Sequence, residues 1–275
     1  MRSYCHRGGE PPLLGLTIPE QLARISARYP DHPAVTALPQ GRRLSYAELA
    51  AEVDRLARGL LGLGFAKGER IGIWSTNNLE WLLLQLATAR IGAILVNINP
   101  AYRPRELAYA LQRARVQGLF CIPAFRQSDY LGMLRELAPT LGRVPAREPL
   151  NAPDLPELRR VLVYDPADPR RTPRPGPGFD TWGDLLAAAA PVPPERLEEI
   201  ELDPDEAINI QFTSGTTGFP KAVLLTHHNL LNNAWFSAQA LGFGPEDRLC
   251  IPVPFYHCFG MVLANLLCLS VGACA

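Results

Sequence analysis

The residues best suited to chemistry form a run of small hydroxyl residues and glycines that ends in a lysine. In order they are Thr213, Ser214, Gly215, Thr216, Thr217, Gly218, Phe219, Pro220 and Lys221. Glycine lets a backbone approach an anion closely and adopt positive φ, while hydroxyls and exposed backbone amides donate hydrogen bonds to phosphate oxygens. The lysine adds a point charge. This composition predicts a phosphate-binding loop, and a Ser/Thr/Gly-rich turn without a ligand is the alternative.

The run is not a Walker A loop. The pattern G-x-x-x-x-G-K-[ST] begun at Gly215 requires glycine at position 220, where this chain has Pro220. A second glycine-rich stretch, residues 62–68, lacks the G-x-G-x-x-G spacing and follows a predicted helix instead of a strand. We interpret it as a helix terminator, so only the run at 213–221 stays a nucleotide candidate.

His257 is the second candidate for chemistry. It follows the apolar residues 249–253, which we predict to be a strand, and it precedes an apolar helix. An imidazole at such a position can orient a carboxylate or transfer a proton near neutral pH. A lone histidine is more often a core or cap residue, and spacing alone favours that alternative. His227 and His228, at the predicted start of another helix, are interpreted as structural.

The run at 213–221 resembles the signature of the AMP-binding, adenylate-forming superfamily, which includes acyl-CoA synthetases, luciferases and nonribosomal adenylation domains. Four further segments look like the acyl-CoA synthetase branch that activates medium-chain fatty acids, and the resemblance covers nearly the whole chain. These segments are residues 4–6, 97–102, 208–212 and 254–258. One position departs from the family, which usually has glycine after the lysine where this chain has Ala222. A methyl group fits there if φ is negative, as expected at a strand start.

The resemblance implies a two-step reaction. A carboxylate attacks the α-phosphate of Mg-ATP, pyrophosphate leaves, and the thiol of coenzyme A then takes the acyl group. ATP, Mg²⁺ and coenzyme A are therefore the implied cofactors and co-substrates, and a fatty acid of medium chain length is the implied substrate. Thr213 to Lys221 would contact ATP and pyrophosphate, and His257 would lie at the mouth of the acyl pocket. His257 and Lys221 are thus the implied catalytic residues, and no residue of this chain is assigned as a metal ligand.

Two other readings remain open. The adenylate could feed a carrier protein or another acceptor, or the chain could be a non-catalytic nucleotide-binding module. The family's Tyr-Gly-x-Thr-Glu segment, ribose aspartate, hinge and late lysine do not occur in this sequence. We therefore expect roughly the first half of such an enzyme, without the small C-terminal domain, and we expect this chain alone to bind ATP weakly and not to complete a turnover.

The elements that must position these residues alternate between helix and strand. Thr17 with Glu20, and Ser45 with Glu48, have the spacing of capping boxes that begin helices. We predict helices from 17, from 45 to 62 or 64, over 78–90, 104–114, 129–137 and 182–190, and from 227. We predict strands at 33–38, 70–74, 91–96, 118–122, 160–164, 207–212 and 221–226. This alternation predicts a doubly wound α/β fold with a parallel sheet and right-handed crossovers.

The domain prediction is a partial N-terminal domain over residues 1–275. Within it we expect a first β/α subdomain at 1–165, a Pro/Gly-rich connection and helix at 166–206, and the start of a second subdomain at 207–275. Residues 168–178 are dense in Pro, Gly and Arg. They lack the aromatic residues that interleave with basic ones in nucleic-acid surfaces, so we interpret them as a solvated loop.

The composition of the chain limits the kinds of partner and compartment that we expect. The 27 Lys and Arg balance 27 Asp and Glu, so long-range attraction to nucleic acid or anionic membranes is not expected. The six cysteines show no zinc-ligand spacing and are predicted to be reduced. Residues 249–275 contain no charged side chain but are interrupted by prolines, and we predict no membrane span. We predict a cytoplasmic protein, with mitochondria as the alternative if a transit peptide lies outside this sequence. The oligomeric state is left open.

Overall fold

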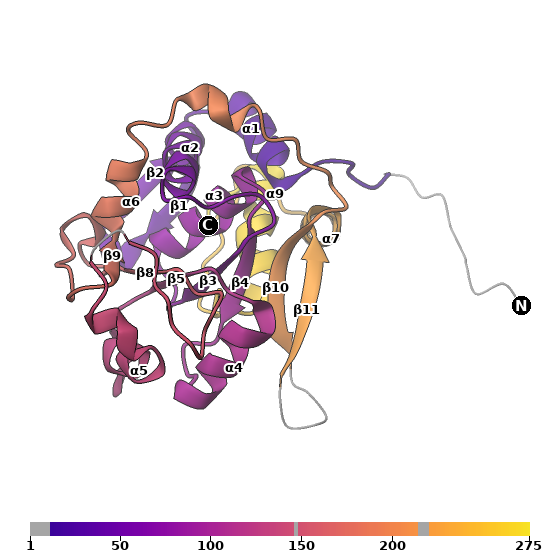
Figure 1. The fold of residues 1–275 in the computed structure, drawn as a ribbon. Helices are drawn as coiled ribbons and strands as arrows, with labels where there is room; N and C mark the ends of the chain where they lie inside the picture. Colours follow the sequence, from indigo (N-terminus) through magenta and orange to yellow (C-terminus); the bar gives the residue numbers. More distant parts are fainter. Residues whose placement is uncertain (1–11, 146–147, 214–219) are drawn as a thin grey trace, which may run out of the picture.

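The centre of the protein is a seven-stranded sheet, seen in a computed structural model that describes residues 12–145, 148–213 and 220–275 (Figure 1). The strand order is β11-β10-β4-β3-β5-β8-β9, and every neighbouring pair is parallel except β10 and β11. The strands are β3 (Arg70–Trp74), β4 (Ile94–Ile98), β5 (Gly118–Cys121), β8 (Arg160–Val163), β9 (Phe179–Thr181), β10 (Ala207–Thr213) and β11 (Lys221–Thr226). The doubly wound α/β prediction is confirmed.

Helices cover both faces of this sheet. In Figure 1, α2, α3 and α6 lie on one side of the row of strands, and α4 and α5 lie on the other. The helices are α1 (Ile18–Arg28), α2 (Tyr46–Gly62), α3 (Leu79–Arg90), α4 (Pro104–Ala114), α5 (Tyr130–Leu137), α6 (Trp182–Ala188) and α7 (His227–Leu241). Single 3-10 turns lie at Leu38–Gln40, Pro139–Gly142, Pro169–Arg171 and Pro194–Leu197.

The helix starts follow from local chemistry. The Thr17 hydroxyl accepts from the backbone N–H of Glu20, and the Glu20 carboxylate accepts from the backbone N–H of Thr17, which closes the predicted capping box. Ser45 and Glu48 repeat the arrangement at α2. Helix α3 differs, because every residue from Leu79 to Ala89 is buried. It has no solvent face because it packs between the sheet and α2.

Several predicted strand positions are corrected. The strand at 33–38 is β1 (Pro33–Ala37), and it lies in a separate antiparallel hairpin with the unpredicted β2 (Arg42–Ser45). The strand predicted at 91–96 begins instead at Ile94, because Ile91 caps α3 and Gly92 turns the chain with φ 68°. Two short elements were not predicted, the edge strand β9 and the hairpin of β6 (Ala124–Phe125) with β7 (Ser128–Asp129).

The strand predicted at 249–253 is wrong. These residues belong to no strand, and the nearest pairing is an isolated parallel bridge between Arg248 and Cys274. Pro252 has no backbone N–H to give to a ladder, which explains why an apolar run fails to pair here. The predicted helix that follows is present as α8 (Cys258–Gly260), a π-helical stretch η5 (Met261–Leu266) and α9 (Leu267–Val271).

One sheet joins the early and late parts of the chain. Strand β10 runs parallel to β4, with Asn209 opposite Leu95, Ile210 opposite Val96 and Gln211 opposite Asn97. The carboxyl ends of β3, β4, β5 and β10 therefore point the same way. Whatever follows these strands in sequence lies along a common edge of the sheet, which is where α/β proteins commonly bind ligands.

Candidate functional site

The predicted phosphate loop connects β10 to β11, which form an antiparallel hairpin. Thr213 is paired with Lys221 at the end of this hairpin where the loop connects the two strands, and both residues are exposed. Pro220 is held from the side, because the hydroxyl of Tyr109 in α4 donates to its carbonyl over 3.0 Å. Residues Ser214, Gly215, Thr216, Thr217, Gly218 and Phe219 lie outside the described residues. The hairpin thus delivers the two ends of the loop to the carboxyl edge of the sheet.

Ala222 fits its position. It pairs with Phe212 inside the regular hairpin, and the only non-glycine residues of the described chain with positive φ are Arg115 and Arg126. The methyl group that replaces the family's usual glycine therefore sits on ordinary extended backbone, where alanine causes no strain.

The two lysines of the chain have different surroundings. Lys67 donates to the carbonyl of Glu201 and forms an ion pair with the carboxylate of Glu206, both over 2.6 Å. The side chain of Lys221 is exposed, and its ammonium group forms no hydrogen bond or ion pair with any described residue. Its ammonium group is therefore available to a ligand beside the predicted phosphate loop.

His257 is exposed and caps a helix. Its Nδ1 accepts the backbone N–H of Phe259 over 3.1 Å, which makes it the N-cap of α8. A backbone amide can only donate, so Nδ1 must be unprotonated and the neutral ring carries its proton on Nε2. The capping role weighed from sequence is thus present, and it leaves the Nε2–H side of the ring for any other partner. His227 is buried and belongs to the packing of α7, as predicted.

A cavity of about 460 Å³ lies beside this histidine at the carboxyl edge of the sheet. Its walls come from the segments after β3 and β4, the β6 strand and the turn before His257. The lining residues are Ser75, Thr76, Asn77, Asn99, Pro100, Ala101, Phe125, Arg126, Pro252, Pro254 and Tyr256. The guanidinium of Arg126 lies 5.1 Å from the centre of the Phe125 ring and forms no ion pair within the described chain. The cavity therefore offers an uncompensated cation to a ligand.

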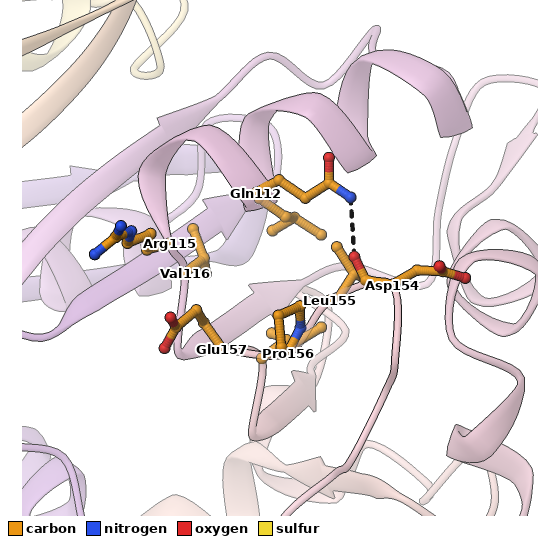
Figure 2. A pocket seen from close by; sticks show the side chains of 9 residues that line it. Gln112, Arg115, Val116, Asp154, Leu155, Pro156 and Glu157 are labelled. Atoms are coloured by element: carbon orange, nitrogen blue, oxygen red, sulfur yellow. Dashed lines mark hydrogen bonds between the residues drawn. The ribbon is translucent and has the colours of Figure 1, made fainter.

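A second cavity, of about 290 Å³, lies at the opposite end of the sheet. Its walls are the end of α4 and residues 154–158, which precede β8. Figure 2 shows Gln112 pointing across it, where its amide donates to the carbonyl of Asp154 over 2.9 Å. Because it adjoins the amino ends of β5 and β8, this cavity is remote from Lys221 and His257.

Sequence reasoning did not single out the asparagines that surround the turn before His257. Asn77 and Asn97 both bond to the backbone of residues 253–256. A signal was present, since Asn97 interrupts the apolar run of β4, and polar side chains alternate with isoleucine in Asn209 and Gln211 of β10. A polar residue in a strand buried on both faces needs a partner.

The described residues hold neither a metal-ligand cluster nor a membrane-spanning helix. No three His, Cys, Asp or Glu side chains come together there as a set of metal ligands. No helix in the same residues combines the length and the apolar character that a bilayer crossing requires.

Comparison with known proteins decides the family. Residues 22–275 match the family model described as AMP-binding enzyme. The chain belongs to this family. It is 38% identical over 264 residues to the mitochondrial medium-chain acyl-CoA ligase of Danio rerio, an alignment that covers 94% of this chain and 42% of that protein. It is 37% identical over 274 residues to an acyl-CoA ligase of Ajellomyces capsulatus, covering 98% of this chain and 43% of that protein.

Solved structures agree on the fold. The apo structure of MbtA from Mycobacterium smegmatis matches with a TM-score of 0.76 at 27% identity, over 95% of this chain and 44% of that one. The resemblance of the sequence to the acyl-CoA synthetase branch is confirmed by these family members. This AMP-binding chain spans a little over two fifths of the length of the curated relatives that it matches.

Proposed function

We propose that this chain supplies the ATP-gripping and carboxylate-orienting part of an acyl-CoA ligase, which converts a medium-chain fatty acid to its acyl-adenylate and then to acyl-CoA. The observation that carries the proposal is the placement of Lys221. This unpaired cation stands opposite Thr213 at the base of the predicted phosphate loop, on the sheet edge that also holds His257.

In the first step the carboxylate attacks the α-phosphate, and the β and γ phosphates of ATP leave as pyrophosphate. Negative charge builds on the leaving group, so fixed donors and a cation around it lower the barrier. Thr213 and Lys221, with the loop residues Ser214 to Pro220, would supply these donors. Mg²⁺ enters with ATP as part of the substrate.

His257 would orient the acid. With Nδ1 occupied by the Phe259 N–H, the ring presents Nε2–H, which can donate to a carboxylate oxygen. This bond holds the carboxylate for attack without removing the electron pair that reacts. The cap on α8 therefore fixes the ring in a tautomer suited to binding an anion.

The acceptor would use the cavity of about 460 Å³. Coenzyme A carries phosphates, and Arg126 is a guanidinium without a carboxylate partner in the described chain, which suits phosphate recognition. Asn99 adds an amide group to the same walls. Because this cavity adjoins Tyr256 and therefore His257, a thiol reaching through it would approach the carbonyl of the adenylate.

The test is ATP–pyrophosphate exchange by the purified chain with a panel of acids from acetate to palmitate, followed by thioester assay with coenzyme A. Exchange that peaks with medium-chain acids, and thioester formation, support the proposal. Exchange without thioester would replace coenzyme A by a carrier protein or another acceptor. ATP binding without exchange with any acid is the result that we expect if this chain alone cannot complete a turnover, and the absence of any ATP binding would contradict the proposal.

A further inference from the structure

The turn that carries His257 is held by two asparagine side chains from neighbouring strands. Asn77, three residues beyond β3, donates through Nδ2 to the carbonyl of Val253 and accepts through Oδ1 from the N–H of Phe255, each over 2.8 Å. Asn97 in β4 donates through Nδ2 to the carbonyl of Tyr256 over 3.1 Å. Three backbone groups just before His257 are therefore satisfied by side chains instead of by a sheet ladder.

A further amide fixes the orientation of Asn97. The Nδ2 group of Asn209 donates to the Oδ1 of Asn97 and to the carbonyl of Leu95, each over 2.9 Å. Since the oxygen of Asn97 is occupied as an acceptor, its amide nitrogen must point toward Tyr256. Asn97 and Asn209 are each only 2% exposed. The pairing of Asn209 with Leu95 in the β4–β10 register places both asparagines on the same face of the sheet.

Burying the amides of Asn97 and Asn209 costs folding free energy. A parallel sheet covered on both faces is normally apolar, and a buried amide is tolerated only when its hydrogen bonds are made. The Oδ1 of Asn209 is buried without a partner among the described residues. A valine or leucine at these positions would pack without that cost, so the asparagines require a reason beyond the stability of the core.

The turn links the bonds made by Asn77 and Asn97 to the imidazole of His257. The N–H of His257 donates to the carbonyl of Pro254 over 3.2 Å, and the N–H groups of Gly260 and Met261 donate to the carbonyl of His257 over 3.0 Å. Gly260 allows the close fit, because a Cβ there would lie 2.4 Å from the carbonyl oxygen of Pro254. The backbone of His257 is thus braced on both sides, and its ring is fixed by Phe259.

From this geometry we infer that Asn77 and Asn97 are positioning residues that set the orientation and tautomer of the His257 ring. The inference concerns this chain's own conformation, and its consequence for acyl activation rests on the proposed function. The two amides act through the turn and do not touch the reacting atoms. Loss of either one frees the turn, lets the Phe259 bond to Nδ1 break, and allows the proton to move between the two ring nitrogens.

The direct test is nitrogen NMR of the whole chain labelled with ¹⁵N-histidine. The chain has five histidines, and His257→Gln identifies the signals of this one. The test variants are Asn97→Ala, Asn77→Ala and Asn77→Asp. Asn77 is exposed, so its variants are expected to fold even where the Asn97 variant does not. The aspartate keeps the acceptor for Phe255 and loses the donor to Val253.

Asn232 provides the matched control. Its amide clamps the backbone of Leu14 in the same manner, accepting from the N–H over 2.7 Å and donating to the carbonyl over 3.0 Å, but it lies on α7 away from the turn. Asn232→Ala removes this pair of bonds, and a third from the same amide to the carbonyl of His228, without reaching His257. It reports what a purely structural loss does to the histidine signals.

We expect the native chain to show His257 as a single Nε2–H tautomer and the Asn77 and Asn97 variants to show an averaged mixture, while Asn232→Ala keeps the native shifts. If the chain catalyses exchange, the variants should lower kcat roughly ten- to hundredfold with little change in KM for ATP. Native shifts in the folded Asn77 variants would overturn the inference. Altered shifts with full exchange activity in His257→Gln would instead sustain the inference and remove His257 from the proposed function.

Discussion

The backbone N–H of Ile18 donates a hydrogen bond to Nδ1 of His227 over 3.2 Å. This bond joins the first residue of α1 to the first residue of α7, 209 positions apart in the chain. His227 is fully buried, and this burial lowers the pKa of its imidazole to about 4. The neighbouring carboxylates of Glu20 and Glu206 act in the opposite direction but do not prevail. The ring is therefore held neutral with Nδ1 as acceptor.

This bond predicts that the chain loses stability in mild acid. The unfolded chain binds a proton at His227 near the ordinary value of 6.5 and the folded chain only near 4. The stabilisation is thus complete above about pH 6.5 and declines as the pH falls toward 4. The loss should reach roughly 3 kcal/mol in the free energy of unfolding. Urea unfolding between pH 7.5 and 4.5 measures it.

His227→Asn isolates this contribution, since its side-chain oxygen can accept from Ile18 and does not titrate. The slope of stability against pH should be shallower in this variant than in the native chain. His228→Gln, one residue further along α7, is the control and should keep the native slope. Parallel curves for the native chain and His227→Asn would contradict the prediction.

The Arg42–Glu80 ion pair predicts an asymmetric response to mutation. Glu80 is fully buried, accepting from Arg42 over 2.9 Å and from Gln40 over 2.7 Å, and burial raises the pKa of its carboxyl. Arg42→Met leaves the buried carboxylate of Glu80 without its cationic partner and should lower the free energy of unfolding by about 3 kcal/mol. Adding Glu80→Met should recover most of that loss, because the uncompensated charge is gone. Denaturant unfolding of both variants decides between recovery and additive loss.

The exposed Arg196–Glu199 pair is the control for this experiment. Both side chains are more than half exposed. Arg196→Met should therefore change the unfolding free energy by less than about 1 kcal/mol. A similar loss at Arg42 and Arg196 would mean that burial does not set the value of the Arg42–Glu80 pair.

The two lysines allow a direct test of the phosphate loop. An amine-reactive reagent should modify Lys221 faster than Lys67, because Lys67 is held by Glu201 and Glu206. Mg-ATP should slow the modification of Lys221 and leave that of Lys67 unchanged, as measured by peptide mass spectrometry. If exchange activity is found, Lys221→Ala should lower it by roughly a hundredfold, the scale of losing one donor to a charged transition state. Lys67→Ala should retain it, and equal ATP protection of both lysines would remove Lys221 from the site.

Local patterns in the sequence predicted most of the elements but not all of their partners. The capping boxes at Thr17 and Ser45 are short-range signals that were interpreted correctly, and the apolar run of β4 predicted the strand but not its first residue. Strand β2 was missed because Arg42 and Arg43 lack an apolar alternation, and its pairing with β1 depends on the turn between them. Strand β9 has three residues, and only its contact with β8 makes it a strand.

The candidate site also has residues that the sequence predicted and contacts that it did not. The chemistry at Thr213, Lys221 and His257 could be read from residue types and from a resemblance, and their roles stay predictions. The positions of Asn77 and Asn97 relative to residues 253–256 could not, since these contacts join parts of the chain more than 150 residues apart. The strand predicted at 249–253 failed for a related reason. Pro252 removes one ladder donor, and the carbonyl of Val253 bonds to the distant side chain of Asn77, which no local pattern records.

For Gly62, the local sequence and the long-range packing predict opposite effects of substitution. From sequence it is a helix terminator, and by helix propensity Gly62→Ala should stabilise the end of α2 by up to about 1 kcal/mol. In the folded chain, however, a Cβ at Gly62 would lie 2.0 Å from the carbonyl oxygen of Ala188, at the end of α6. That atom is backbone and cannot rotate away, so the two helices must separate. We therefore predict that Gly62→Ala lowers the free energy of unfolding by about 1–3 kcal/mol.

The control is Gly142→Ala, where no atom lies within 4 Å of the added methyl group. Denaturant unfolding of that variant should stay within about 0.5 kcal/mol of the native chain. If Gly62→Ala were as stable as the native chain, the contact between α2 and α6 would be looser than the structure has it. Glycine at 62 would then serve only to end the helix. If it is destabilised while Gly142→Ala is not, close packing against Ala188 is the reason that position 62 requires glycine.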